Sequence, residues 1–78
     1  MIESVRFYEL EKPGLGRRLV AAVEEATLFA LAFPMAGTPI QQGVRRVLVR
    51  DFPFAIMYRP SGEGITVFAI AHTSRKPG

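Results

Sequence analysis

The sequence predicts an α+β protein in which a helical hairpin packs on a three-stranded antiparallel sheet. Three observations predict this class: two helical patterns precede residue 35, three β-rich segments follow residue 43, and the connections between those segments are short. Elements segregated in this way typically form one helical layer on one antiparallel sheet. A chain of 78 residues has room for one thin core, so we expect residues 1–78 to form a single domain.

The first half of the chain carries the two helical patterns. Apolar residues recur at helical spacing from Ile2 to Tyr8, and Pro13-Gly14 should end this short helix. A second helix is predicted over residues 15–33, where apolar residues recur at alternating steps of four and three. This stripe consists of Leu19, Val23, Ala26, Ala30 and Phe33. A proline follows at once and disfavours further helix, and the glycines and prolines of residues 37–43 predict a loop.

The second half of the chain changes to the period of a strand. β-Branched residues alternate with arginines over residues 44–50, and residues 54–59 and 65–71 are rich in Phe, Ile, Val and Tyr. The two connections, at residues 51–53 and 60–64, are dense in turn-forming residues, which predicts an antiparallel meander of three strands. Because the last two strands are apolar on both faces, the face away from the helices should also be at least partly covered.

Composition excludes several classes of protein. The chain has no cysteine, which removes disulfide and thiolate sites, and its first ten residues lack the apolar run of a signal peptide or membrane span. No spacing of histidine and acidic residues predicts a metal site, and the Gly14/Gly16 pair lacks the strand and the further glycine of a phosphate loop. We therefore expect no cofactor and a cytoplasmic setting.

Positive charge is concentrated in the second half of the chain. Residues 1–43 contain four basic and five acidic residues, whereas residues 44–78 contain six basic and two acidic ones. This asymmetry suits a surface that meets phosphate or acidic protein. A solvated face of arginines has the same composition, so charge alone leaves both interpretations open.

Five short motifs follow one another along the chain. They are Pro13-Gly14-Leu15-Gly16-Arg17-Arg18-Leu19 leading into residues 21–26, Phe33-Pro34 through Gly37, Gly43-Val44-Arg45-Arg46, Phe52 through Ile56 with Tyr58-Arg59, and Ala69-Ile70-Ala71-His72 with residues 75–78. In this order they resemble the RelE/ParE superfamily of toxins from bacterial type II toxin–antitoxin systems. The resemblance covers essentially the whole chain and is closer to the ParE-like, plasmid-stabilisation branch.

Two features depart from the pattern of that family. Members usually begin with a strand and a longer first helix, whereas Met1 falls inside the equivalent of that helix, and they tend to continue past the equivalent of Gly78. We therefore expect a domain shortened at both ends. Loss of the first strand would leave an open sheet edge, which invites a homo-oligomer.

The resemblance implies a toxin that a cognate antitoxin neutralises. ParE-like toxins need no proton transfer, only a surface that docks on DNA gyrase, so we expect no enzymatic activity. Two alternatives stay open. One is a RelE-like endonuclease that cleaves mRNA on the ribosome, and the other is a shortened remnant that binds antitoxin and poisons nothing.

The ribonuclease alternative gives roles to a few residues in the second half. By resemblance, Arg59 would hold the scissile phosphate, His72 would act as acid or base, and Arg45, Arg46 or Arg75 would help to neutralise charge. His72 is the one side chain that titrates near neutral pH, although a histidine that closes a strand commonly caps it by hydrogen bonding. The tyrosine that the nuclease branch often has near its carboxyl terminus is missing.

Two groups of residues are predicted to bind the antitoxin. Leu28 and Phe29 lie outside the apolar stripe of the second helix, so this end of the helix is apolar on more than one face. Burial between the first helix and the sheet would explain the same pattern. The functional interpretation is a groove for an amphipathic antitoxin helix or an added strand, with Arg45, Arg46 and Arg50 meeting an acidic antitoxin tail.

Overall fold

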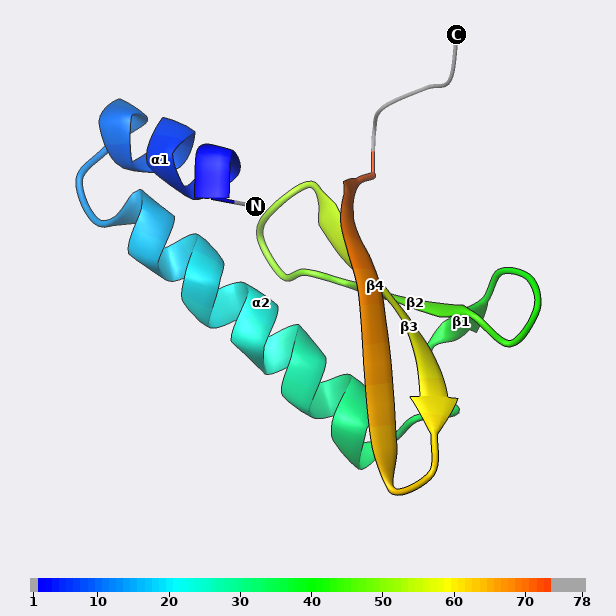
Figure 1. Ribbon diagram of the computed structural model, residues 1–78. Helices are drawn as coiled ribbons and strands as arrows, with labels where there is room; N and C mark the ends of the chain where they lie inside the picture. The colour runs from blue at the N-terminus through cyan, green and yellow to red at the C-terminus, as the bar shows by residue number, and fades with distance from the viewer. Residues whose placement is uncertain (1, 74–78) are drawn as a thin grey trace, which may run out of the picture.

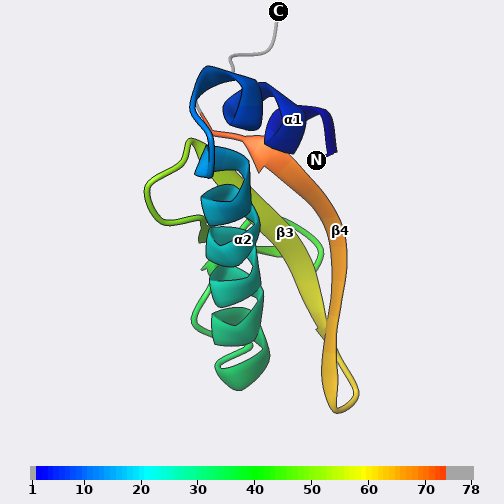
Figure 2. The same ribbon diagram turned by 90° about the vertical axis from the view of Figure 1, so that its left-hand side faces the viewer.

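The computed structural model describes residues 2–73 of the chain. Two helices are followed by four strands: α1 (Ile2–Glu11), α2 (Leu15–Ala32), β1 (Thr38–Pro39), β2 (Arg45–Leu48), β3 (Phe54–Ser61) and β4 (Gly64–His72). Figure 1 shows α1 and α2 as a hairpin to one side of the sheet, and Figure 2 shows α2 running along the sheet with α1 across its upper end. Neither helix combines the length and the hydropathy that a membrane crossing requires.

The strands form one antiparallel sheet in the order β1-β2-β3-β4. The predicted helical hairpin on an antiparallel meander is confirmed, but the number of strands was wrong. Thr38 pairs with Arg46 and Pro39 with Arg45, in a segment predicted as a loop. A strand of two residues that contains a proline has no periodic signal, which explains why the sequence did not predict it.

The β3–β4 connection is shorter than the predicted loop of residues 60–64. Strand β3 continues to Ser61 and β4 begins at Gly64, so that two residues form the turn. Gly62 has a φ of 52°, a conformation that tight hairpin turns require and that glycine adopts without steric cost. The two strands of the hairpin are therefore longer than the sequence predicted.

The core lies between α2 and the inner face of the sheet. Leu19, Ala26 and Ala30 of the predicted stripe are buried, and Val23 packs against them. Phe33 is 60% exposed, because α2 ends at Ala32 and the backbone leaves the helical conformation at Phe33. The sheet and its adjoining loop contribute Val49, Phe54, Ile56 and Tyr58 to the buried cluster.

A carboxylate joins α1 to α2. Glu9 accepts hydrogen bonds from the backbone N–H groups of Gly14, at 2.8 Å, and Gly16, at 3.1 Å. The Gly14 N–H, together with the Gly16 and Arg17 N–H groups and the Arg17 charge, holds the pKa of Glu9 below its usual value of 4.5. Gly16 permits the close contact of the two helices, because a Cβ there would lie 2.6 Å from the Val5 carbonyl oxygen.

A buried tyrosine ties the loop after α2 to the sheet. Tyr58 is fully buried, and its hydroxyl donates to the Pro34 carbonyl oxygen at 2.7 Å and accepts from the Gly37 N–H at 3.2 Å. Arg45 Nη1 adds hydrogen bonds to the carbonyl oxygens of Met35, at 2.9 Å, and Gly37, at 2.8 Å. A side chain at position 37 would collide with the Tyr58 hydroxyl, so this contact requires glycine.

The sheet face opposite the helices carries the alternate residues of each strand. Phe68 is 54% exposed on this face, so within the described residues the face is covered only in part. Arg59 lies over the Phe68 ring, with its guanidinium carbon 5.1 Å from the ring centroid. A charge in this position is attracted by the face of the ring.

Candidate functional site

A groove lies between α2 and the β2 side of the sheet. Two adjoining hollows of about 300 and 280 Å³ share the residues Glu25 and Arg50. The first is also lined by Arg18, Ala21, Ala22, Asp51 and Phe52, and the second by Ala26, Phe29, Val47 and Leu48. Their joint surface is called the α2–β2 groove below.

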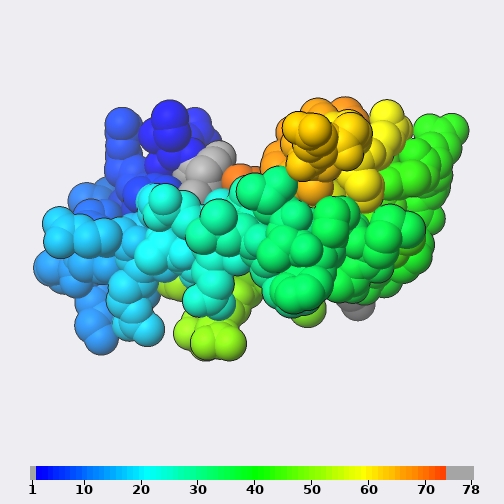
Figure 3. Space-filling model, turned by 90° about the horizontal axis from the view of Figure 1, so that it is seen from below, coloured from blue at the N-terminus to red at the C-terminus, as the bar shows by residue number. Residues whose placement is uncertain are grey.

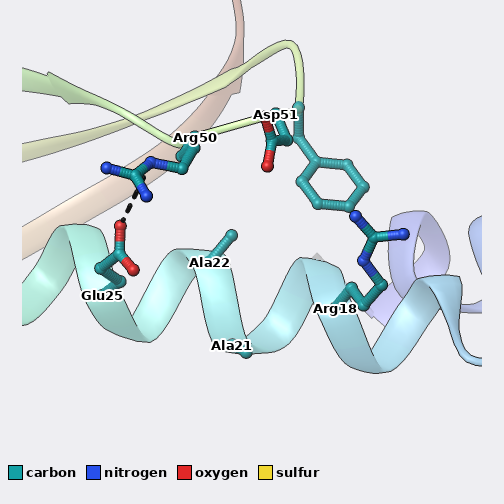
Figure 4. Close-up of a pocket in the computed structure, with 7 residues that line it drawn as sticks. Arg18, Ala21, Ala22, Glu25, Arg50 and Asp51 are labelled. Carbon is teal, nitrogen blue, oxygen red and sulfur yellow. Dashed lines mark ion pairs between the residues drawn. The ribbon is translucent and has the colours of Figure 1, made fainter.

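Charged side chains cross the first part of this groove. Figure 4 shows Arg18 and Glu25 projecting from α2 toward the loop that carries Arg50 and Asp51. Arg50 Nε lies 3.7 Å from Glu25 Oε1, and the two side chains are 76% and 62% exposed. An ion pair this exposed contributes about 0–1 kcal/mol. An acidic ligand can therefore exchange for Glu25 at little cost.

The second part of the α2–β2 groove is apolar. Phe29 is 45% exposed and Leu48 is 63% exposed, and both line the hollow that Arg50 borders. The ring of Phe29 packs on that of Phe33, with 5.6 Å between centroids, which steadies its position. Glu25 precedes Phe29 by four residues and so lies on the same side of α2. The groove thus has an apolar centre next to an accessible cation.

The structure separates Leu28 from Phe29. Leu28 is 64% exposed and lines a different hollow of about 290 Å³ with Val23, Glu24 and Thr27. Successive residues of a helix point about 100° apart, so the two side chains lie on different sides of α2. Phe29 therefore belongs to the α2–β2 groove and Leu28 does not.

The three predicted binding arginines also have different surroundings. Arg45 is half-buried, and its guanidinium is held by the loop carbonyls of Met35 and Gly37. Arg46 is exposed on the opposite face of the sheet, because successive strand residues alternate between faces. Among these three arginines, Arg50 is the one that lines the groove.

The structure does not bring the candidate catalytic residues Arg59 and His72 together. His72 pairs with Phe54 and lies edge-on to its ring at 5.4 Å, near one end of the hairpin. Arg59 pairs with Thr66, five residues further along β3 than Phe54, which places it on the opposite face and about 17 Å away along the strand. The third candidate, Arg75, lies outside the described residues.

Residues 2–73 contain no cluster of side chains that could bind a metal ion. No group of three histidine, cysteine, aspartate or glutamate side chains gathers there in a way that could hold a metal ion. The charged residues of the α2–β2 groove are two arginines with Glu25 and Asp51, which form a binding surface of mixed charge.

Among the groove residues that sequence reasoning missed are Arg18, Glu25 and Leu48. A helical projection could have found the first two, because Arg18, Glu25 and Phe29 share one side of α2 at steps of seven and four. Nothing local places Leu48 beside them, because its position depends on how α2 crosses the sheet. Tyr58 was noted as part of a motif, and its role in holding the loop after α2 became clear only from the fold.

The comparison with protein families gives a match that spans nearly the whole chain. The ParE toxin of the type II toxin–antitoxin system, parDE, matches residues 3–77. Comparisons with curated proteins and with solved structures give no match. The predicted resemblance to toxins of type II toxin–antitoxin systems is thereby confirmed, and membership of this family implies an antitoxin as a partner. The chain belongs to the ParE toxin family of type II toxin–antitoxin systems.

Proposed function

We propose that this toxin is neutralised by an antitoxin that lays an acidic amphipathic segment in the α2–β2 groove. One observation carries the proposal: exposed apolar side chains, Phe29 and Leu48, adjoin an exposed cation, Arg50. Amphipathic helices commonly bind proteins by placing their apolar side chains in such a groove. Acidic side chains beside those anchors would replace Glu25 in its ion pair with Arg50.

The length of the groove supports a helical ligand. From Arg18 to Phe29 the groove follows eleven residues of α2, which is about 16 Å at the rise of a helix. A bound helix of about three turns has the same length, enough for two or three apolar anchors at steps of three and four. Arg18 and Arg50 then give two sites of positive charge along this length.

For the toxic action, we infer docking on a protein target such as DNA gyrase. The distance between Arg59 and His72 supports this over RNA cleavage, because a general acid or base must lie within hydrogen-bond reach of the group it serves. A surface that blocks a topoisomerase requires shape and charge, and needs no proton transfer. The assignment to gyrase in particular follows the ParE family and rests on analogy.

Induction of the chain in bacteria without its antitoxin tests the toxic action. We expect filamentous, dying cells and inhibition of DNA supercoiling by purified gyrase, because blocked replication prevents division. Arg59→Ala and His72→Ala should retain this toxicity at equal protein levels. Loss of toxicity in these variants, with the fold intact, would support ribonuclease action instead. Normal growth with soluble protein present would contradict the toxin assignment.

A further inference from the structure

Large apolar side chains are exposed where the chain leaves α2. Phe29, Phe33 and Met35 are 45%, 60% and 68% exposed, and they are called the α2-end surface below. The rings of Phe29 and Phe33 pack on each other, and Met35 follows in the loop toward β1. Figure 3 shows the end of α2 and the residues after it as one green surface beside the yellow β3–β4 turn. Large apolar residues grouped in this way commonly mark a contact with another protein.

The backbone beneath the α2-end surface is fixed from the sheet. Arg45 Nη1 donates to the Met35 carbonyl oxygen at 2.9 Å, and the Tyr58 hydroxyl donates to the Pro34 carbonyl oxygen at 2.7 Å. Both donors belong to strands, so the loop after α2 is held in place while its apolar side chains point outward. A loop fixed in advance has less conformational freedom to lose on binding. Exposed side chains on such a loop are well suited to anchor a protein contact.

The surroundings of the α2-end surface are cationic. Residues 26–50 contain three arginines and no aspartate or glutamate. Arg45 places its positive charge against the backbone of Met35. Arg46 is exposed, and it lies on the strand that pairs with β1, directly after this loop. Apolar anchors in a positive field favour a partner whose apolar pocket is bordered by carboxylates.

The same charge disfavours a second copy of the chain as the occupant. Two copies that met through this surface would bring Arg45 and Arg46 of one toward those of the other, and like charges oppose association. Glu63 does not offset this charge, because it lies in the β3–β4 turn next to Gly64, on the Leu31 side of α2. The surface therefore fits a different protein with an acidic rim.

We propose that the α2-end surface is where this toxin docks on its protein target, with Phe33 and Met35 seated in an apolar pocket. The inference rests on the proposed function, in which the toxin acts by docking on a protein. Phe29 belongs both to the α2-end surface and to the α2–β2 groove. An antitoxin segment seated in the groove therefore covers part of the target contact, so the two partners exclude each other. Neutralisation then needs no change in the shape of the toxin.

Substitution of Met35 tests the docking surface. Met35→Asp should raise the toxin concentration that half-inhibits supercoiling by purified DNA gyrase about tenfold or more, because it places an acid in a pocket that is apolar and has an acidic rim. Induced cells should survive at equal levels of soluble protein. Antitoxin binding should stay as in the parent chain, since Met35 does not line the α2–β2 groove.

Two matched variants control for the Met35 result. Met35→Leu keeps an apolar side chain of similar volume and should stay toxic. Leu28→Asp introduces the same acid at 64% exposure on another side of α2, and it should stay toxic as well. Phe33→Asp is a second probe of the surface and should lose toxicity as Met35→Asp does. Circular dichroism of each variant measures whether its fold is retained.

Charge reversal tests the acidic rim. Arg46→Glu should weaken inhibition of the target about threefold, because it puts like charges across the contact. Lys12→Glu makes the same change in net charge at an exposed position between the two helices, and it should inhibit as the parent chain does.

Gel filtration of mixtures tests the exclusion of one partner by the other. Antitoxin added first should restore supercoiling, and toxin, antitoxin and gyrase should not elute as one complex. A stable ternary complex would overturn the proposal. Retardation of plasmid DNA by the toxin alone, abolished in Met35→Asp, would also overturn it, because the surface would then bind nucleic acid.

The toxicity of the variants separates this proposal from the proposed function. If the parent chain kills cells and both Met35→Asp and Phe33→Asp kill equally well, the docking surface is wrong and the toxin assignment stands. Unchanged toxicity with lost antitoxin binding would assign the surface to the antitoxin. A parent chain that kills cells without inhibiting gyrase would contradict gyrase alone, and the survival of the variants would still decide the docking surface. A harmless parent chain would overturn both proposals.

Discussion

The two sides of α2 expose apolar side chains to the same extent but differ in what surrounds them. Phe29 on the β2 side is 45% exposed and Leu31 on the β4 side is 46% exposed. Phe29 has Glu25 and Arg50 as neighbours in the α2–β2 groove. Leu31 lies beside Gly64 at the start of β4, a strand without lysine, arginine, aspartate or glutamate. Exposure alone therefore does not identify a partner, whereas the neighbouring charge of Glu25 and Arg50 favours an acidic ligand on the β2 side of α2.

The largest effect is expected from a substitution in the core, which supports both sides of α2. Leu19→Ala should lower the free energy of unfolding by about 2–5 kcal/mol, because Leu19 is fully buried in the core on the inner side of α2 and the substitution leaves a cavity. A domain of this size has few such contacts, so both surfaces should be lost together. Urea unfolding measures the change. Val20→Ala, at a half-exposed neighbour, should cost less than about 1 kcal/mol, and equal losses in the two variants would contradict the described core.

A smaller loss of stability is expected from Tyr58→Phe. The substitution removes one hydroxyl and leaves the Gly37 N–H and the Pro34 carbonyl without their partner, which should cost about 1–3 kcal/mol. Because these bonds fix the loop after α2, amide exchange should quicken there before it changes in α1. Tyr8→Phe makes the same chemical change on a half-buried ring near Phe52 and serves as the control. Unchanged exchange at Gly37 would show that Tyr58 does not hold this loop.

Substitutions on the two sides of α2 sharpen the comparison directly. Phe29→Asp and Arg50→Glu should each weaken antitoxin binding about tenfold or more, which is about 1.4 kcal/mol, by removing an apolar anchor or reversing a charge. Leu28→Asp places the same acid one residue away, outside the α2–β2 groove, and should bind as the parent chain does. Titration calorimetry at two salt concentrations measures both effects. Weaker binding by Leu28→Asp alone would move the antitoxin to another surface.

The smallest effect is expected from Glu9, which joins α1 to α2 in the helical hairpin. The pKa of Glu9 is lowered in the folded chain because backbone N–H groups donate to its carboxylate, so the contact stabilises the fold above pH 4.5 and is lost as the pH falls through the lowered value. Glu9→Gln should reduce the melting temperature slightly at pH 7. The difference between the two proteins should shrink as the pH falls through the lowered pKa of Glu9. A difference that grows on acidification would contradict the hydrogen bonds from Gly14 and Gly16.

The periodic elements of this fold could be predicted from the sequence, because their signals are local. The stripe from Leu19 to Ala30 and the β-rich segments correspond to α2 and to β2, β3 and β4. Strand β1 could not be predicted, since its two residues acquire their conformation only by pairing with Arg45 and Arg46. In the same way, the sequence alone does not show that the Tyr58 hydroxyl requires a glycine at position 37, because the two residues meet only in the fold.

The candidate site was predicted in part. Arg50 and Phe29 were singled out for charge and for apolar character, and the fold places both in one groove. Arg45 and Arg46 looked equivalent to Arg50 in the sequence, but the alternation of the strand turns one of them toward the loop after α2 and the other to the opposite face. Leu28 and Phe29 lie on different sides of α2, because successive residues of a helix point about 100° apart. The contacts that distinguish these neighbours are all distant in sequence.

The binding site of the antitoxin on the toxin is the central claim, and amide chemical-shift mapping of the labelled toxin tests it most directly. Titration with the antitoxin should shift or broaden the signals of Glu25, Phe29, Leu48 and Arg50 most strongly, and leave those of Val20, Thr27 and Leu31 nearly unchanged. Changes concentrated on Val20, Thr27 and Leu31, with the α2–β2 groove silent, would contradict the claim and would assign the antitoxin to the other side of α2.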